Sequence, residues 1–162
     1  MTNLESATPT PIPPHAREHS RALVEHPFQR HCGLEILDQA PGRCRTRLRV
    51  APATDNLSQA LHGGVTYAMI DVTSMLATLP LLAAEEYAVS TSMATTILTA
   101  VPRGAQAEFE SEVIRAGRTM IVTETKAFRM EADGARTLFA TAQISKVRLA
   151  QDIRAPTPRS CP

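Results

Sequence analysis

The stretch Asn56-Leu-Ser-Gln-Ala-Leu-His62-Gly63-Gly64 leads directly into the long apolar run VTYAMIDVTSMLATLPLLAA, and the two together decide the fold of this chain. Apolar residues recur in the run at i, i+3, i+4 and i+7 spacing, which is typical of a helix with one buried face; they are Val65, Ala68, Met69, Val72, Met75, Leu76 and Leu79. Asp71 is the only charged residue before Glu85 and falls at the edge of this stripe. A carboxylate there is partly desolvated, which costs free energy unless it has a partner or a chemical role. Asp71 is therefore the first candidate for a catalytic residue.

The Gly63-Gly64 pair lies where this helix is expected to begin. A helix N-terminus offers unpaired N–H groups and the positive end of the macrodipole, so it can bind an anion or polarise a carbonyl group. Gly63 and Asp71 are separated by roughly 12 Å along one helix, at 1.5 Å per residue. One acyl carbon cannot meet both groups from the same chain. The spacing therefore predicts a dimer with antiparallel helices, in which Asp71 of one subunit acts beside Gly63 of the other.

Asn56, His62-Gly63-Gly64 and Asp71, followed by Val89-Ser90-Thr91-Ser92-Met93, resemble the hotdog-fold acyl-CoA thioesterases of the phenylacetyl-CoA thioesterase-like branch. The resemblance covers residues 27–148 and implies an α+β hotdog fold, with a curved antiparallel sheet wrapped around one long central helix. It also implies hydrolysis of acyl-CoA thioesters and self-association as a homodimer or a dimer-of-dimers tetramer. Family members often carry Asp then Asn where this chain has Ser92 and Ala94, so the acyl preference stays open.

The resemblance implies a catalytic role for each of five residues. Asp71 would act as a general base on water or as a nucleophile that forms an anhydride, while the Gly63 N–H polarises the thioester carbonyl. His62 would orient the loop or help to bind the thioester, Asn56 would orient substrate or water, and Ser90 would position the hydrolytic water. Each residue also has a structural interpretation: a helix-flank acid, a turn glycine, a helix cap, an Asx turn and a strand hydroxyl respectively.

Four further residues are candidates for substrate binding. Gly64 lets a ligand approach the backbone closely, and Met75, together with Met69, suggests an apolar and adaptable acyl tunnel. Arg115 and Arg118 flank a predicted turn and are candidates for binding the phosphates of coenzyme A. Most of the cations in the second half of the chain are expected on a solvated face; they are Arg103, Arg115, Arg118, Lys126, Arg129, Lys146 and Arg148.

The composition fits one domain in a chain of 162 residues with 43% hydrophobic content. We expect the hotdog domain at residues 15–150, between disordered tails at 1–14 and 151–162. A net charge of +1 and 4% aromatic residues favour neither nucleic-acid nor membrane binding. The cysteines, at positions 32, 44 and 161, form no CxxC pair, which indicates reduced thiols in a cytoplasmic protein.

The periodicity also predicts the order of the elements. A short helix is expected at 15–26, then strands at 33–39 and 43–50, and the long helix at 63–84, ended or kinked by Pro80. Four strand-like segments follow as an antiparallel run, at residues 87–99, 106–115, 119–131 and 136–148, with a hairpin turn at Asp133-Gly134.

Other kinds of chemistry find little support. The chain has no GxSxG, GxGxxG or Walker sequence, and the cluster of histidines at positions 15, 19, 26 and 31 beside Cys32 is more typical of a surface than of a zinc site. No metal or redox cofactor is expected. Two alternatives remain: a hotdog-fold dehydratase or hydratase, whose Pro-Gly-rich approach to the helix is absent from NLSQALHGG, and a non-catalytic acyl-binding protein, which would not need Asp71.

Overall fold

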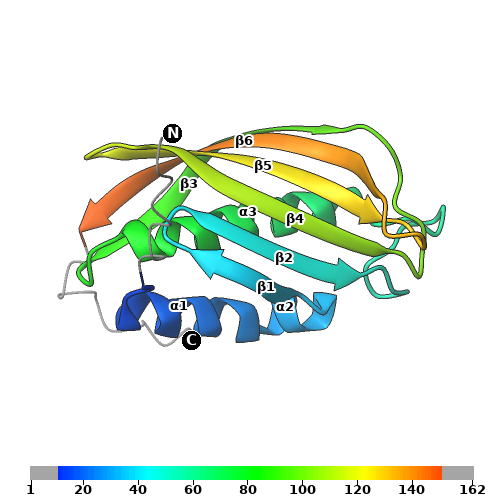
Figure 1. The fold of residues 1–162 in the computed structure, drawn as a ribbon, viewed down its shortest axis with the longest axis horizontal. Coiled ribbons are helices and arrows are strands. Elements are labelled where there is room, and N and C mark those ends of the chain that lie inside the picture. Colours follow the sequence, from blue (N-terminus) through cyan, green and yellow to red (C-terminus); the bar gives the residue numbers. More distant parts are fainter. Residues whose placement is uncertain (1–10, 151–162) are drawn as a thin grey trace, which may run out of the picture.

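Six antiparallel strands curve around one long helix in the computed structural model, which describes residues 11–150 (Figure 1). The strands are β1 (Glu35–Ala40), β2 (Arg43–Arg49), β3 (Glu86–Ile97), β4 (Gln106–Ala116), β5 (Met120–Met130) and β6 (Arg136–Ala150). The helices are α1 (Pro14–Glu25), α2 (Pro27–Cys32) and the central α3 (Gly63–Thr78), which continues into a 3-10 turn at Leu79–Leu81. The predicted α+β hotdog architecture is confirmed.

The strand order in the sheet is β1-β2-β4-β5-β6-β3. The sequence suggested that the last four strands follow one another as a continuous run, but β3 pairs with β6 and β4 pairs with β2 and β5. β3 is therefore an edge strand, and β6 and β5 lie between it and β4 in the sheet. This edge position leaves one side of a 12-residue strand without a partner in the described sheet.

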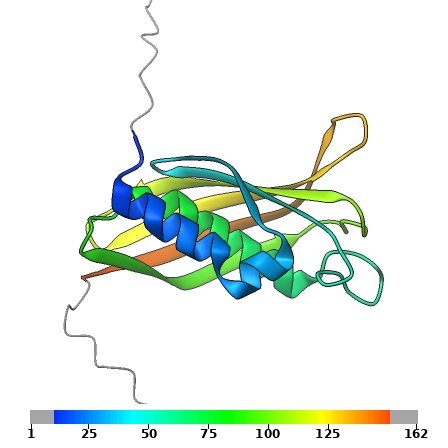
Figure 2. The ribbon, with the colours of Figure 1, turned by 90° about the horizontal axis from the view of Figure 1, so that it is seen from below.

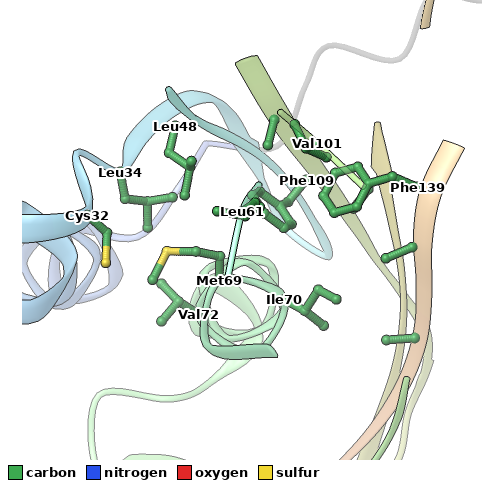
Figure 3. Close-up of a cluster of buried hydrophobic side chains, with 14 of the residues drawn as sticks. Cys32, Leu34, Leu48, Leu61, Met69, Ile70, Val72, Val101, Phe109 and Phe139 are labelled. Carbon is green, nitrogen blue, oxygen red and sulfur yellow. The ribbon is translucent and has the colours of Figure 1, made fainter. Parts of the chain in front are cut away.

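The sheet wraps α3 so closely that the helix is buried on most of its surface, not on one face alone. Apolar residues of α3 meet strand residues such as Phe109 and Phe139 in the main core, as Figure 3 shows. Buried hydroxyl groups of the helix also have partners: the Thr73 hydroxyl donates to the Met69 carbonyl at 2.7 Å and lies 2.7 Å from the Thr46 hydroxyl on β2. The segment Gly63–Leu81 is long and apolar enough to cross a membrane by length and composition, yet 61% of it is buried inside the fold. It packs as a core helix.

The first two helices cover the side of α3 next to β1 (Figure 2). The Gln39 side chain of β1 connects α1 with α3. Its Nε2 donates to Ser20 Oγ on α1 at 2.8 Å and to the Leu76 carbonyl on α3 at 2.6 Å. The predicted stop before Pro27 is confirmed, but α2 was missed: Pro27 ends one helix and opens the next, where its missing N–H costs nothing.

Most predicted boundaries are close to the observed ones. The central helix ends at Thr78 and not near residue 84, since Pro80 lies in the 3-10 turn that follows. The predicted disordered tails fall largely outside the described residues, although Pro14 already belongs to α1.

Candidate active site

The start of α3 is capped by His62. Its backbone is extended (φ −64°, ψ 133°), and its Nδ1 accepts a hydrogen bond from the Gly64 N–H at 2.9 Å. A Cβ on residue 64 would lie 3.1 Å from that nitrogen, so glycine permits the close approach of the ring. The structural interpretation of His62 as a cap is therefore supported. The Gly64 N–H, predicted to lie in the substrate-binding region, is already used by the cap.

The Gly63 N–H is a free donor in this turn. Among the described residues no hydrogen-bond acceptor for it is found, as expected at the first position of a helix. Gly63 lines a pocket of about 310 Å³ together with Asn56, Thr66, Ile97 and Phe139, among others. No carboxylate lines this pocket within the described part of the chain. A donor and an apolar space are thus present at the helix start, but no acid of the same chain.

Asn56 organises the loop in front of the helix. Its Oδ1 accepts hydrogen bonds from the N–H groups of Ser58 at 2.9 Å and Ala60 at 3.2 Å. These bonds hold the tight turn in which Gln59 adopts a left-handed conformation, with φ at 57°. The Asx-turn interpretation of Asn56 is supported, and the residue also lines the Gly63 pocket.

The acid end of the site joins three elements. Asp71 of α3 accepts two hydrogen bonds at one oxygen, Oδ1: from Ser90 Oγ of β3 at 2.5 Å and from Lys146 Nζ of β6 at 3.0 Å. Lys146 Nζ also donates to Ser90 Oγ at 2.7 Å. The side chain of Asp71 is 41% exposed, whereas that of Lys146 is completely buried. Two of these three residues, Asp71 and Ser90, were candidates from the sequence.

Lys146 was expected on a solvated face, and that prediction is wrong. β6 alternates between the two faces of the sheet, and its inward positions Ala140, Ala142 and Ile144 are buried against α3. Lys146 continues this inward series. Burial lowers the pKa of its ammonium group below the ordinary value, and the Asp71 carboxylate partly offsets that effect. A charged residue at an apolar position of the alternation was the sequence signal that could have identified it.

A β-bulge in β3 supports the placement of Ser90. The register pairs Ser90 with Lys146 and then shifts, so that Ser92 pairs with Ser145. The pairing places Ser90 beside Lys146, on the inner face of the sheet. After the shift, Ser92 lies opposite Ser145, which belongs to the outer face. The bulge is therefore a local device that brings one strand hydroxyl to the acid.

Apart from Gly64, the residues predicted to bind substrate do not gather near Gly63. Met69 is completely buried in the main core (Figure 3), so it does not line an open acyl tunnel in this chain. Met75 packs against a second buried cluster that contains Ile121. Arg115 and Arg118 are exposed, at and just beyond the end of β4 and near the last turn of α3, which is about 20 Å from Gly63 along the helix.

Two backbone hydrogen bonds connect the last turn of α3 to β4 through Gly42. The Gly42 N–H donates to the Ala77 carbonyl at 3.0 Å, and the Val113 N–H donates to the Gly42 carbonyl at 2.8 Å. The two arginines and the Gly63 pocket are thus at opposite ends of one chain. A role of these arginines beside Gly63 would require a second subunit.

The thiols and histidines offer no second centre. Within residues 11–150, no group of three or more His, Cys, Asp or Glu side chains has the arrangement of a metal site. Cys32 and Cys44 are free and buried. Burial, with a smaller effect of Asp38, raises the pKa of the Cys44 thiol to about 12, so it is not a nucleophile at neutral pH. Cys161 lies outside the described residues.

One narrow stripe of α3 is open to solvent and runs along the edge strand. Gly64 and Tyr67 are exposed on it and Asp71 is half-exposed, at helical spacing. Apolar side chains of β3, including Val89, Met93 and Ile97, are also exposed. An unpaired strand edge beside exposed apolar groups is typical of a surface that another chain covers.

Comparison with known proteins agrees with this architecture. Residues 59–135 match the model of the thioesterase superfamily, and no curated protein matches the sequence. A thioesterase family protein from Silicibacter pomeroyi is 21% identical, covers 84% of this chain and 98% of its own, and superimposes with a TM-score of 0.77. The PaaI protein of E. coli, from the phenylacetic acid degradation operon, is 16% identical over 87% of this chain and 98% of its own (TM-score 0.74). Zebra fish thioesterase superfamily member 2 is 26% identical over 80% and 93%, with a TM-score of 0.67.

Proposed function

We propose that this chain, a hotdog-fold member of the thioesterase superfamily, hydrolyses acyl-CoA thioesters to the free acid and coenzyme A. The observation that carries the proposal is the pair of complementary groups on α3. Gly63, whose N–H is free, lines an apolar pocket, and a half-exposed, hydrogen-bonded carboxylate at Asp71 lies two helical turns further on. Thioester hydrolysis needs a donor that stabilises negative charge on the carbonyl oxygen, and a helix-end N–H can supply it. It also needs a group that accepts a proton from water or attacks the carbonyl carbon, and a carboxylate can do either.

The active site is formed by two subunits. α3 is continuous from Gly63 to Thr78, so Gly63 and Asp71 of one chain stay roughly 12 Å apart. No acid of the same chain lines the Gly63 pocket among the described residues. Antiparallel association along β3 and the open stripe of α3 would bring Asp71 of each subunit to Gly63 of the other. The same association would cover the apolar side chains of Val89, Met93 and Ile97 and pair the free strand edge.

In the general-base route, Asp71 accepts a proton from water as the water oxygen attacks the thioester carbonyl carbon. The carbonyl oxygen becomes negatively charged, and the Gly63 N–H and the positive end of the helix dipole stabilise it. Collapse of the tetrahedral intermediate breaks the carbon–sulfur bond, and the sulfur leaves as the thiolate of coenzyme A. In the nucleophilic route the carboxylate itself attacks, forms an anhydride, and water then hydrolyses that anhydride. Neither route requires a metal or a redox cofactor.

The test is a panel of acyl-CoA thioesters assayed with a thiol-reactive dye. It includes arylacetyl, benzoyl, and medium- to long-chain acyl groups, because the apolar Gly63 pocket sets no single acyl class. We expect release of coenzyme A with at least one member, and its loss in Asp71→Asn. Absence of thiol release across the panel, with an enoyl-CoA hydrated by the same preparation, would favour the dehydratase or hydratase alternative. Tight acyl-CoA binding without turnover would favour an acyl-binding protein.

A further inference from the structure

Lys146 is a completely buried cation beside the candidate catalytic acid. Its Nζ lies 3.0 Å from Asp71 Oδ1 and 2.7 Å from Ser90 Oγ. Its register partners are Ser90 on β3 and Ile121 on β5, neither of which is charged. Among the described residues, Asp71 is therefore the charged group that faces this ammonium. The next inward cation on β6, Arg148, is paired with Glu86 at 2.8 Å and belongs to a separate contact.

The two carboxylate oxygens of Asp71 differ in their hydrogen bonds. Ser90 and Lys146 both donate to Oδ1. No donor to Oδ2 is found in the part of the chain that the structure describes, and the side chain is 41% exposed. One oxygen is thus fixed from inside the protein, and the other remains available to a water molecule or a thioester carbon.

A lysine at this place is not explained by stability. Removing an ammonium group from water is costly, and replacing a buried ion pair by well-packed apolar groups is often neutral or stabilising. The carboxylate of this pair is half-exposed, which weakens the attraction that would repay the burial. A buried cation that gives little stability, and whose hydrogen bonds reach the candidate acid and its neighbour, points to a role in the chemistry.

We propose that Lys146 is a positioning residue, which fixes Asp71 and Ser90 through its two hydrogen bonds and leaves Oδ2 free as the reacting oxygen. This inference rests on the proposed thioester hydrolysis. Lys146 does not contact the substrate, since its side chain is closed off from solvent. It acts through the acid that it holds.

The kinetic test is Lys146→Met, which keeps most of the length of the side chain and removes the charge. We expect kcat to fall by up to about 10²-fold, the scale on which a misplaced catalytic group acts, with KM nearly unchanged and the melting temperature held or raised. Lys126→Met, an exposed lysine on β5, is the matched control and should leave all of these quantities unchanged.

The same series contains the results that overturn the proposal. A folded Lys146→Met enzyme with normal kcat would show that the ammonium has no catalytic consequence. A lower melting temperature with normal turnover per folded molecule would make Lys146 a structural residue. In the Asp71→Asn background, Lys146→Met should have no further effect on kcat, since the lysine acts only through that acid.

A second measurement needs neither turnover nor a folded Lys146 variant. The side-chain nitrogen of Lys146 is titrated by NMR in the wild-type protein and in Asp71→Asn, with Glu124→Gln as the control for an exposed acid. Burial lowers the pKa of Lys146 and the Asp71 carboxylate raises it, so the titration should move to lower pH in Asp71→Asn and stay in place in the control. An unmoved titration in Asp71→Asn would contradict the coupling. Failure of the acyl-CoA panel would instead contradict the proposed activity and leave this readout unaffected.

Discussion

The two ends of the candidate site are built in different ways. The donor end is made by one continuous segment, from Asn56 to Gly64, whose side chains bond to backbone groups two to four residues away. The acid end joins side chains from three elements: Ser90 is 19 residues from Asp71, and Lys146 is 75 residues from it. A local motif holds the donor, whereas the tertiary fold holds the acid.

This difference affects how each end responds to substitution. Changes to the bonding side chains of the donor end, Asn56 and His62, act on a turn and a helix cap, so they should alter loop stability as well as turnover. Changes at the acid end act on a side chain that is half-exposed, so they should alter turnover with little effect on folding. The predictions below test that contrast.

The largest effect is expected at the acid. Asp71→Asn should lower kcat by at least about 10²-fold, as for loss of a general base or nucleophile. The amide oxygen can still accept from Ser90 and Lys146, so the fold should be preserved. Steady-state kinetics with circular dichroism as the folding control measures this, and Glu85→Gln, an exposed acid beyond the helix, is the matched comparison. Turnover near the wild-type value would remove Asp71 from the mechanism.

A smaller effect is expected at Ser90. Ser90→Ala removes one donor to Asp71 Oδ1 and one acceptor for Lys146. The loss of one hydrogen bond to a charged group corresponds to about 1.4 kcal/mol, or about 10-fold in kcat. Ser92→Ala, beyond the bulge on the same strand, should have no effect. Equal losses in the two variants would mean that the strand, and not the Ser90 hydroxyl, supports the acid.

The smallest effect on turnover is expected from a conservative change at Asn56. Asn56→Asp keeps the oxygen that accepts from Ser58 and Ala60, so stability and kcat should stay close to wild type if the residue only holds the loop. Asn56→Ala should lower the free energy of unfolding by about 1 kcal/mol, as for loss of a side-chain cap. Thermal unfolding and kinetics of the pair separate the two roles. A large loss of kcat in Asn56→Asp with normal stability would assign the amide nitrogen to substrate or water.

The donor end could be predicted from sequence because its information is local. The glycine pair, the capping histidine and the apolar period fall within one continuous stretch, and they predicted where α3 begins and that Asp71 interrupts its apolar surface. The edge position of β3 could not be predicted in the same way. It depends on β4 pairing with β2 and not with β3, a contact between segments about 60 residues apart in the sequence.

The acid end could be predicted only in part. Ser90 was assigned by resemblance, and Lys146 was expected on a solvated face because cations are mostly solvated. Lys146 is in the same alternating series as Ala140, Ala142 and Ile144, and this series indicates that the lysine is buried. The indication can be used only once the inward face of β6 is known. Met69 was expected to line the acyl tunnel, but it lies in the core. The sheet covers more of α3 than one apolar stripe, so this side chain is closed off inside the fold.

The central claim is that each active site combines Gly63 of one subunit with Asp71 of the other. Two inactive variants test it, Gly63→Pro and Asp71→Ala. Gly63 is the first residue of α3, where proline is well accepted while its missing N–H removes the donor. His62 before it has φ −64° and ψ 133°, a conformation that a following proline favours. The variant should therefore fold and lose only the donor.

The decisive measurement is the activity of the purified hybrid of these two variants, co-expressed with different tags. In a hybrid dimer with shared sites, one site carries both substitutions and the other carries neither. We predict about half of the wild-type activity per dimer, while each parent homodimer stays inactive. A hybrid that is folded and dimeric, yet as inactive as its parents, would contradict the shared site.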